Sequence, residues 1–238
     1  MTLEKGIVLK TIDYQENSKI IYIMTETGLK SAIVRGAKKL KSKTFSYAQP
    51  ITFIEFNIQK ERYIDACNVI NYFNNNKLDY KRIESCLKIT EISYLLGNHI
   101  TDYQIFFSFL VEILELINND EKNYLFYELV FRTKTLYLLG VAPVLNKCVC
   151  CGKKENIVGF SFNNGGMKCK KCITNDDFIY PKDTIETIRI MYLKKLNVLI
   201  ELVQSNQISF NYEKVNHFLN LYYSQYLGFN SKVNEVLK

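Results

Sequence analysis

The chain has 238 residues, of which 47% are hydrophobic and 23% charged, and its formal net charge is +7. This composition is typical of a folded globular protein and excludes an extensively disordered chain, and no stretch is apolar enough to predict a membrane span or a membrane partner. Residues 1–80 carry 12 basic and 8 acidic side chains, so the excess charge at the front of the chain favours a polyanionic partner there.

The first 78 residues contain five short runs with the pattern of β-strands. We expect these strands at about residues 7–14, 20–24, 30–35, 51–58 and 63–73. Five short strands with a longer connection between the third and the fourth are typical of an OB-fold barrel. An SH3-like barrel fits the same strand pattern almost as well. We therefore predict an N-terminal OB-fold, DNA-binding domain over residues 1–78.

The connection after the third strand is unusually basic, with five basic residues among nine and no acidic residue. Cations at this density repel one another unless an anion lies against them, and nucleic-acid phosphate is the natural anion. A merely solvated loop is the alternative. The aromatic residues Phe45, Tyr47 and Phe53 follow closely and are candidates for stacking on bases, with core packing the favoured role of Phe53. We predict the following DNA-binding residues: Arg35, Lys38, Lys39, Lys41 and Lys43.

Residues 79–147 and 179–238 have apolar residues at helical spacing. Helices are expected at about residues 83–96, 103–117 and 121–139, and again within residues 182–227. Thr101 or Asp102 is suited to the N-cap of the second helix, and Gly140 and Gly228 are suited to helix ends. The two segments together predict one mainly α-helical domain, interrupted by an insertion over residues 148–178.

That insertion contains two Cys-x-x-Cys pairs, separated by seventeen residues. Two such pairs bring four thiolates to one ion, which is the pattern of a structural zinc site on a ribbon-like hairpin. Gly152 is suited to the positive φ of the first turn, and residues 160–166 are expected to form a strand and turn of the hairpin. The predicted ligands of a structural Zn²⁺ are Cys148, Cys151, Cys169 and Cys172.

The cysteines allow other interpretations. The chain has seven cysteines, and this odd number argues against a disulfide framework. Its start lacks the pattern of a secretory signal, which favours a reducing cytoplasm as its location. Iron in a rubredoxin-like site is a second alternative. Cys150 does not share the ligand spacing and stays ambiguous, whereas Cys67 and Cys86 lie in apolar patterns typical of core residues.

The sequence contains no motif of a catalytic site: we find no phosphate-binding glycine loop, no His-Glu-x-x-His and no Gly-x-Ser-x-Gly. A metal-dependent nuclease has little support because no carboxylate cluster is visible. We therefore expect a binding module rather than an enzyme. The main alternative to DNA binding is a protein-interaction adaptor with a structural zinc hairpin and no direct role on DNA.

Short motifs that occur in one order over nearly the whole chain carry a family resemblance. They lie at Asp13–Ser18, Thr25–Lys30, Val34–Lys39, Gln49–Pro50, Leu139–Pro143, Cys148–Gly152, Gly165–Cys169 and Tyr226–Lys232. In this order they resemble the RecO family of bacterial recombination mediators. The resemblance implies an N-terminal OB fold, a helical domain and a zinc-finger insertion, in agreement with the expectations above.

The resemblance also implies a function in recombinational DNA repair. Members bind single- and double-stranded DNA, anneal complementary strands and, with RecR, promote loading of RecA onto DNA coated with single-strand-binding protein (SSB). They are not enzymes, and they work in the cytoplasm at the nucleoid. The acidic tail of SSB would suit an apolar groove flanked by Lys or Arg in the helical domain. The Lys41–Lys43 stretch departs from the family in having little Arg, so bidentate phosphate contacts would be fewer.

Overall fold

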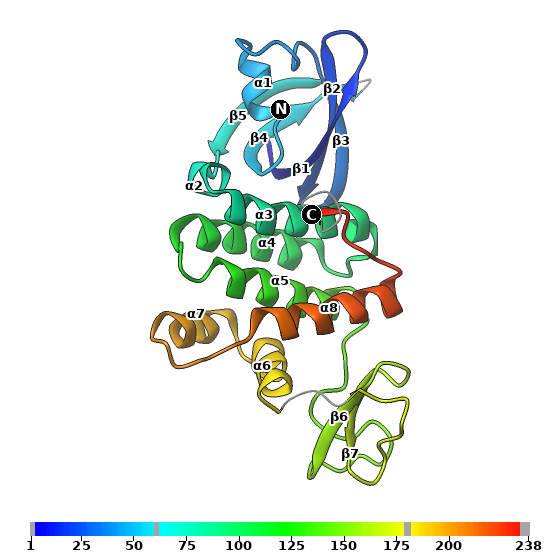
Figure 1. The fold of residues 1–238 in the computed structure, drawn as a ribbon. Helices are drawn as coiled ribbons and strands as arrows, with labels where there is room; N and C mark the ends of the chain where they lie inside the picture. Colours follow the sequence, from blue (N-terminus) through cyan, green and yellow to red (C-terminus); the bar gives the residue numbers. More distant parts are fainter. Residues whose placement is uncertain (1–2, 60–61, 179–181, 234–238) are drawn as a thin grey trace. The chain divides into compact units, whose positions relative to one another are not determined.

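The computed structural model describes residues 3–59, 62–178 and 182–233 (Figure 1). Contacts divide the chain into two compact units, Met1–Glu128 with Ser231–Lys238 and Leu129–Asn230. The three-part division at residues 78, 147 and 178 stays a prediction. Residues 179–181 and 234–238, which belong to the second predicted helical segment, lie outside the described residues.

Five antiparallel strands form the barrel of the first unit (Figure 1). They are β1 (Glu4–Tyr14), β2 (Ser18–Thr25), β3 (Gly28–Val34), β4 (Thr52–Ile58) and β5 (Ile64–Asn71). Their order is β3-β2-β1-β4-β5, and a parallel bridge between Ile33 and Tyr63 joins the two ends of the sheet. In an OB fold the first strand pairs with the second and the fourth, and the third strand meets the fifth. The strands β1 to β5 are arranged in this way. The OB prediction is thus confirmed over the SH3-like alternative.

The barrel is closed tightly around its own apolar side chains. Ile21, Ile23, Ile54 and Phe56 are fully or almost fully buried in this core. Gly6 in β1 pairs with Thr25 of β2 and Ile54 of β4, and a Cβ at this position would collide with the side chain of Ile23. Glycine is therefore needed at this point of β1 because a larger residue would force the strands apart.

The basic connection after β3 contains a short helix that the sequence did not predict. Helix α1 (Lys43–Tyr47) begins after Ser42, whose hydroxyl accepts the backbone N–H of Thr44 at 3.1 Å. A helix of five residues is too short to show a helical period, so only its cap could have indicated it. Lys43 consequently lies on this helix rather than in an extended loop.

Helices follow the barrel in the first unit. They are α2 (Asn74–Leu78), α3 (Tyr80–Leu96), the 3₁₀ turn η2 (Gly97–His99), α4 (Tyr103–Asn119) and the start of α5 (Tyr124–Leu138). The three long helices agree with the predicted ones, and Asp102 is the N-cap of α4 because its carboxylate accepts the Ile105 N–H at 3.0 Å. The ring of Phe53 in β4 packs edge-on against Phe107 of α4, with 6.0 Å between ring centroids.

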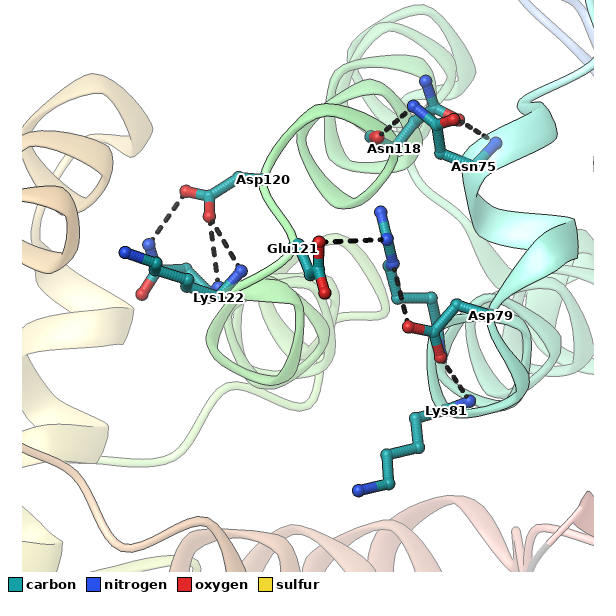
Figure 2. A network of polar contacts seen from close by, with 9 residues as sticks. Asn75, Asp79, Lys81, Asn118, Asp120, Glu121 and Lys122 are labelled. Carbon is teal, nitrogen blue, oxygen red and sulfur yellow. Dashed lines mark hydrogen bonds and ion pairs between the residues drawn. The ribbon is translucent and has the colours of Figure 1, made fainter.

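A polar network fixes the ends of these helices (Figure 2). Asp79 caps α3 by accepting the N–H groups of Lys81 and Arg82, and the Arg82 guanidinium reaches Glu121 at 3.7 Å. Asp120 ends α4 and accepts the backbone N–H of Lys122 at 3.2 Å in the turn that leads to α5. Because Asp79 satisfies the first N–H groups of α3 and Arg82 contacts Glu121 of this turn, the turn between α4 and α5 is held beside α3.

The second unit contains the rest of α5, a two-stranded hairpin and the last helices. These elements are β6 (Ile157–Ser161), β7 (Gly166–Cys169), α6 (Lys182–Leu193), α7 (Leu196–Gln204) and α8 (Tyr212–Leu227). Phe160 of the hairpin packs against Phe218 of α8 at 4.8 Å between centroids. Gly140 and Gly228 have φ of +71° and +59° at the ends of α5 and α8, as predicted. None of the helices in the described ranges is both long and apolar enough to cross a membrane.

Candidate metal centre and nucleic-acid interface

The structure brings the four predicted metal ligands together. The sulfur atoms of Cys148, Cys151, Cys169 and Cys172 all lie within 4.8 Å of one another. The Cys151 and Cys169 sulfurs are 3.7 Å apart. Thiolates around a tetrahedral Zn²⁺, at about 2.3 Å from the ion, would be separated by about 3.8 Å. The cluster therefore has the size and donor set that could hold one metal ion of this kind.

Backbone hydrogen bonds shape both turns of this cluster. In the first turn the Gly152 N–H donates to the Cys148 carbonyl at 2.9 Å, and Gly152 has the predicted positive φ of +72°. In the second turn the Cys172 N–H donates to the Cys169 carbonyl at 2.9 Å. The Val149 N–H donates to the Met167 carbonyl of β7 at 2.8 Å. The hairpin thus positions one turn against the other.

The thiols of the cluster influence one another's ionisation. Burial raises the pKa of Cys148, but N–H groups of the surrounding backbone outweigh it and lower the pKa to about 6. The backbone N–H of Lys171 is the main cause of a lowered pKa at Cys169. The neighbouring thiols Cys151 and Cys169 raise the pKa of Cys172 to about 12. Four thiolates this close repel strongly, so their full ionisation needs a cation among them.

A buried ion pair supports the hairpin beside the cysteines. Lys168 in β7 donates to the Asp177 carboxylate at 2.9 Å, and the two side chains are only 6% and 3% exposed. Asp177 also accepts the backbone N–H of Thr174 at 2.8 Å, just after the second cysteine pair. Burial alone would raise the pKa of Asp177, but hydrogen bonds from Ser161, Lys168 and Thr174 hold it far below its usual range. The pair therefore stays charged and ties β7 to the chain that leaves the cluster.

The predicted DNA-binding residues gather on one connection of the barrel but differ in their surroundings. Lys39, Lys41 and Lys43 are exposed, and among the described residues none of the three forms an ion pair. The Arg35 guanidinium lies 3.9 Å from the centroid of the Tyr63 ring. A guanidinium stacked in this way keeps its planar fork of N–H donors available for phosphate.

Lys38 has a different position from its neighbours because its ammonium group contacts the protein itself. Its Nζ donates to the Gln15 carbonyl at 2.9 Å and lies 3.3 Å from the Asp13 carboxylate. Its backbone N–H donates to the Asn17 carbonyl at 3.3 Å. Lys38 therefore anchors the basic connection to the β1–β2 turn, and its charge is already partly compensated by Asp13.

Phe45 and Tyr47, two of the aromatic residues considered for base stacking, are half-buried and contact the protein. Tyr47 packs against the barrel core, and burial raises the pKa of its hydroxyl to about 12. Phe45 lies under Lys19, whose Nζ is 5.5 Å from the ring centroid. Sequence reasoning missed the contributions of Lys19 and Tyr63, because neither residue lies in the basic connection.

A groove of about 430 Å³ is the other notable feature of the first unit. Leu9, Leu87 and Leu95 contribute apolar walls, and Lys10 and Lys232 also line it. The Lys10 ammonium lies 4.6 Å from the centroid of the Tyr94 ring. Glu91 at the groove is satisfied, since its carboxylate accepts the Ser231 hydroxyl at 2.5 Å and the Lys232 N–H at 2.9 Å. The groove therefore has apolar walls, two cationic residues and one carboxylate, Glu91.

Comparison with known proteins covers both parts of the chain. Residues 1–75 match the family model described as "Recombination protein O N terminal", and residues 78–235 match "Recombination protein O C terminal". A "DNA repair protein RecO" from Oceanobacillus iheyensis is 30% identical, over 99% of this chain and 93% of that protein. Proteins with the same name from Caldanaerobacter subterraneus and Halalkalibacterium halodurans are 29% and 26% identical, over 89% and 98% of this chain and 81% and 92% of theirs.

Replacement of Asp177 by Asn should destabilise the hairpin, because it leaves the Lys168 ammonium buried without a counter-charge. The expected loss is about 3 kcal/mol in the free energy of opening of β6 and β7. Native-state hydrogen exchange of the hairpin amides measures this quantity. The double variant Lys168→Met/Asp177→Leu, which removes both charges, should recover much of the loss. Equal protection in Asp177→Asn and the parent protein would contradict a stabilising role for the pair.

Proposed function

Because the chain belongs to the RecO family, we propose that it is a non-catalytic mediator of recombinational DNA repair. In this role it binds single- and double-stranded DNA, anneals complementary strands and, with RecR, promotes RecA loading onto SSB-coated DNA at the nucleoid in the cytoplasm. The observation that carries the proposal is an OB barrel with a connection whose exposed cations have no acidic partner within the described part of the chain. Polyanion binding relieves the mutual repulsion of these cations.

The DNA contacts are assigned by the environment of each side chain. Lys39, Lys41 and Lys43 are solvent-exposed point charges for phosphates, and Arg35 adds a planar guanidinium held against Tyr63. Lys38 acts mainly by positioning the connection, since its ammonium group is bound to Gln15 and Asp13. Four cations of this kind correspond to about four phosphate contacts.

The cysteine cluster is assigned to a structural zinc ion. Four sulfur donors leave no open coordination position, so the ion would brace the hairpin rather than activate a substrate. Cys148, Cys151, Cys169 and Cys172 hold it, and Cys150, which is exposed, lies outside the set. The hairpin packs on α8 through Phe160, so a folded hairpin also supports the helical part of the second unit.

The groove of the first unit is assigned to the acidic tail of SSB. Its apolar walls suit apolar side chains of a peptide, while Lys10 and Lys232 suit the carboxylates. Glu91 keeps its negative charge at the groove, because its two hydrogen-bond donors, the Ser231 hydroxyl and the Lys232 N–H, are neutral. The two lysines must therefore outweigh one carboxylate when an acidic peptide binds. The groove lies between β1 and α3.

Titration of fluorescent single-stranded DNA at several salt concentrations tests the DNA contacts. With about four phosphate contacts, the logarithm of the binding constant should fall with the logarithm of salt at a slope near −3. Lys39→Ala/Lys41→Ala should reduce the slope to about −1.5, because two contacts are lost. The matched control Lys81→Ala/Lys122→Ala removes two exposed lysines of the same unit, one in α3 and one in the turn before α5, and it should keep the slope. A flat response of the parent protein would refute DNA binding, and a pull-down that retains protein partners without DNA would favour the adaptor.

Elemental analysis of protein purified without added metal tests the metal assignment. We expect one zinc per chain. Cys169→Ser should lose the ion and the order of the hairpin, because metal binding and folding of such a site are one equilibrium. Cys150→Ser, a cysteine substitution in the first turn between two of the predicted ligands, should retain one zinc. Iron in the purified protein, or a full zinc content in Cys169→Ser, would overturn the assignment.

Fluorescence anisotropy with a labelled peptide of the acidic SSB tail tests the groove. Lys10→Glu/Lys232→Glu should weaken peptide binding by roughly tenfold or more, since two attractive charges become repulsive. Lys5→Glu/Lys81→Glu makes the same change in net charge at exposed positions that do not line the groove, and it should bind nearly as the parent protein does. Equal weakening by both variants would show that only net charge matters.

A further inference from the structure

The basic connection contains a large apolar side chain that the protein leaves in solvent. Leu40 is 79% exposed and lies between the exposed cations Lys39 and Lys41. An apolar side chain in water loses the stabilisation that burial would give it. Single exposed apolar residues are common on protein surfaces. The exposure of Leu40 therefore indicates a binding role only because Leu40 lies between two exposed cations on the basic connection.

The connection presents Leu40 on an ordered turn. The Lys39 N–H donates to the Gly36 carbonyl at 3.1 Å, and the Ser42 N–H donates to the Lys39 carbonyl at 2.8 Å. The second bond closes a tight turn with Leu40 and Lys41 at its centre. On one side the turn is anchored by Lys38, and on the other it leads into α1, which Ser42 caps. Little conformational entropy is therefore lost when this turn meets a ligand.

The charges around Leu40 indicate which surface covers it. A partner must offer anionic groups to Lys39 and Lys41 and an apolar surface between them. Single-stranded DNA does this, because its phosphates alternate with bases whose faces are accessible, whereas a duplex hides those faces in its stack. The neighbouring aromatic residues are less exposed than Leu40, since Tyr47 packs against the barrel core and Phe45 is half-buried with the Lys19 ammonium near its ring.

We propose that Leu40 inserts between neighbouring bases of single-stranded DNA while Lys39 and Lys41 bind the flanking phosphates. This inference rests on the proposed DNA binding and assigns it a mode of contact. Apolar side chains such as Leu act as wedges that unstack base steps in other DNA complexes. An unstacked strand presents separated bases to an incoming complement, which connects the wedge with strand annealing.

A single strand with 2-aminopurine at a central adenine position tests the wedge, because this base fluoresces more strongly when it is unstacked. Saturation with the parent protein should raise the fluorescence. Leu40→Ser should lose most of the rise and bind roughly fivefold more weakly, in proportion to the apolar contact removed. Its salt slope should be unchanged, because the cations remain. Leu40→Met, which keeps a long apolar side chain, should retain the rise.

The matched control is Leu78→Ser. Leu78 is 85% exposed at the end of α2, so its substitution removes an equally exposed leucine and should leave both fluorescence and affinity unchanged. An undiminished rise in Leu40→Ser, with salt-dependent binding intact, would overturn the wedge and leave DNA binding standing. A parent protein without salt-dependent binding would refute DNA binding itself. Leu40-dependent binding to anionic lipid vesicles, without a fluorescence rise on DNA, would assign the side chain to a membrane surface instead.

Discussion

Unequal pairing along the two edges of β1 organises the first unit. On one edge β1 pairs with β2 from Gly6 to Tyr14, with a register shift after Val8, but on the other edge it pairs with β4 only from Glu4 to Val8. Beyond Val8, β4 no longer pairs with β1, and the next residues of β1 line the groove: Leu9, Lys10 and Thr11. The far end of the same strand carries Asp13, which binds the Lys38 ammonium of the basic connection. One strand thus supports both candidate binding surfaces of this unit.

Charged side chains are exposed to solvent in one unit and buried in the other. In the basic connection, like charges are left in solvent and their repulsion is available to favour an anion. In the hairpin, Lys168 and Asp177 are withdrawn from water as a pair, and the thiols lie so close that only a cation among them can balance full ionisation. The first arrangement suits reversible binding to a polymer that salt can displace, whereas the second suits a permanent support of the fold.

The sequence predicts those features that depend on neighbouring residues. The spacing of the cysteines encodes the thiol cluster, and Asp102, Gly140 and Gly228 mark helix ends because capping is local. The density of lysines predicts the exposed connection. The anchoring of Lys38 was not predictable, because it needs Gln15 and Asp13 from another turn, and Arg35 stacking on Tyr63 needs the closed barrel. The role of Tyr47 was open from sequence alone because core and surface aromatic residues share one pattern. Its place against the core follows from the barrel.

The hydrogen bonds of Glu91 have a consequence for biosynthesis. Its carboxylate is satisfied by Ser231 and Lys232, which lie 140 and 141 residues further along the chain. During translation the barrel and the first helices leave the ribosome long before these residues are made. Until the second unit has been synthesised, water alone satisfies the Glu91 carboxylate of the nascent first unit, and the groove lacks the wall formed by Lys232 and Val233. The groove is therefore completed only after the whole of the second unit has been made.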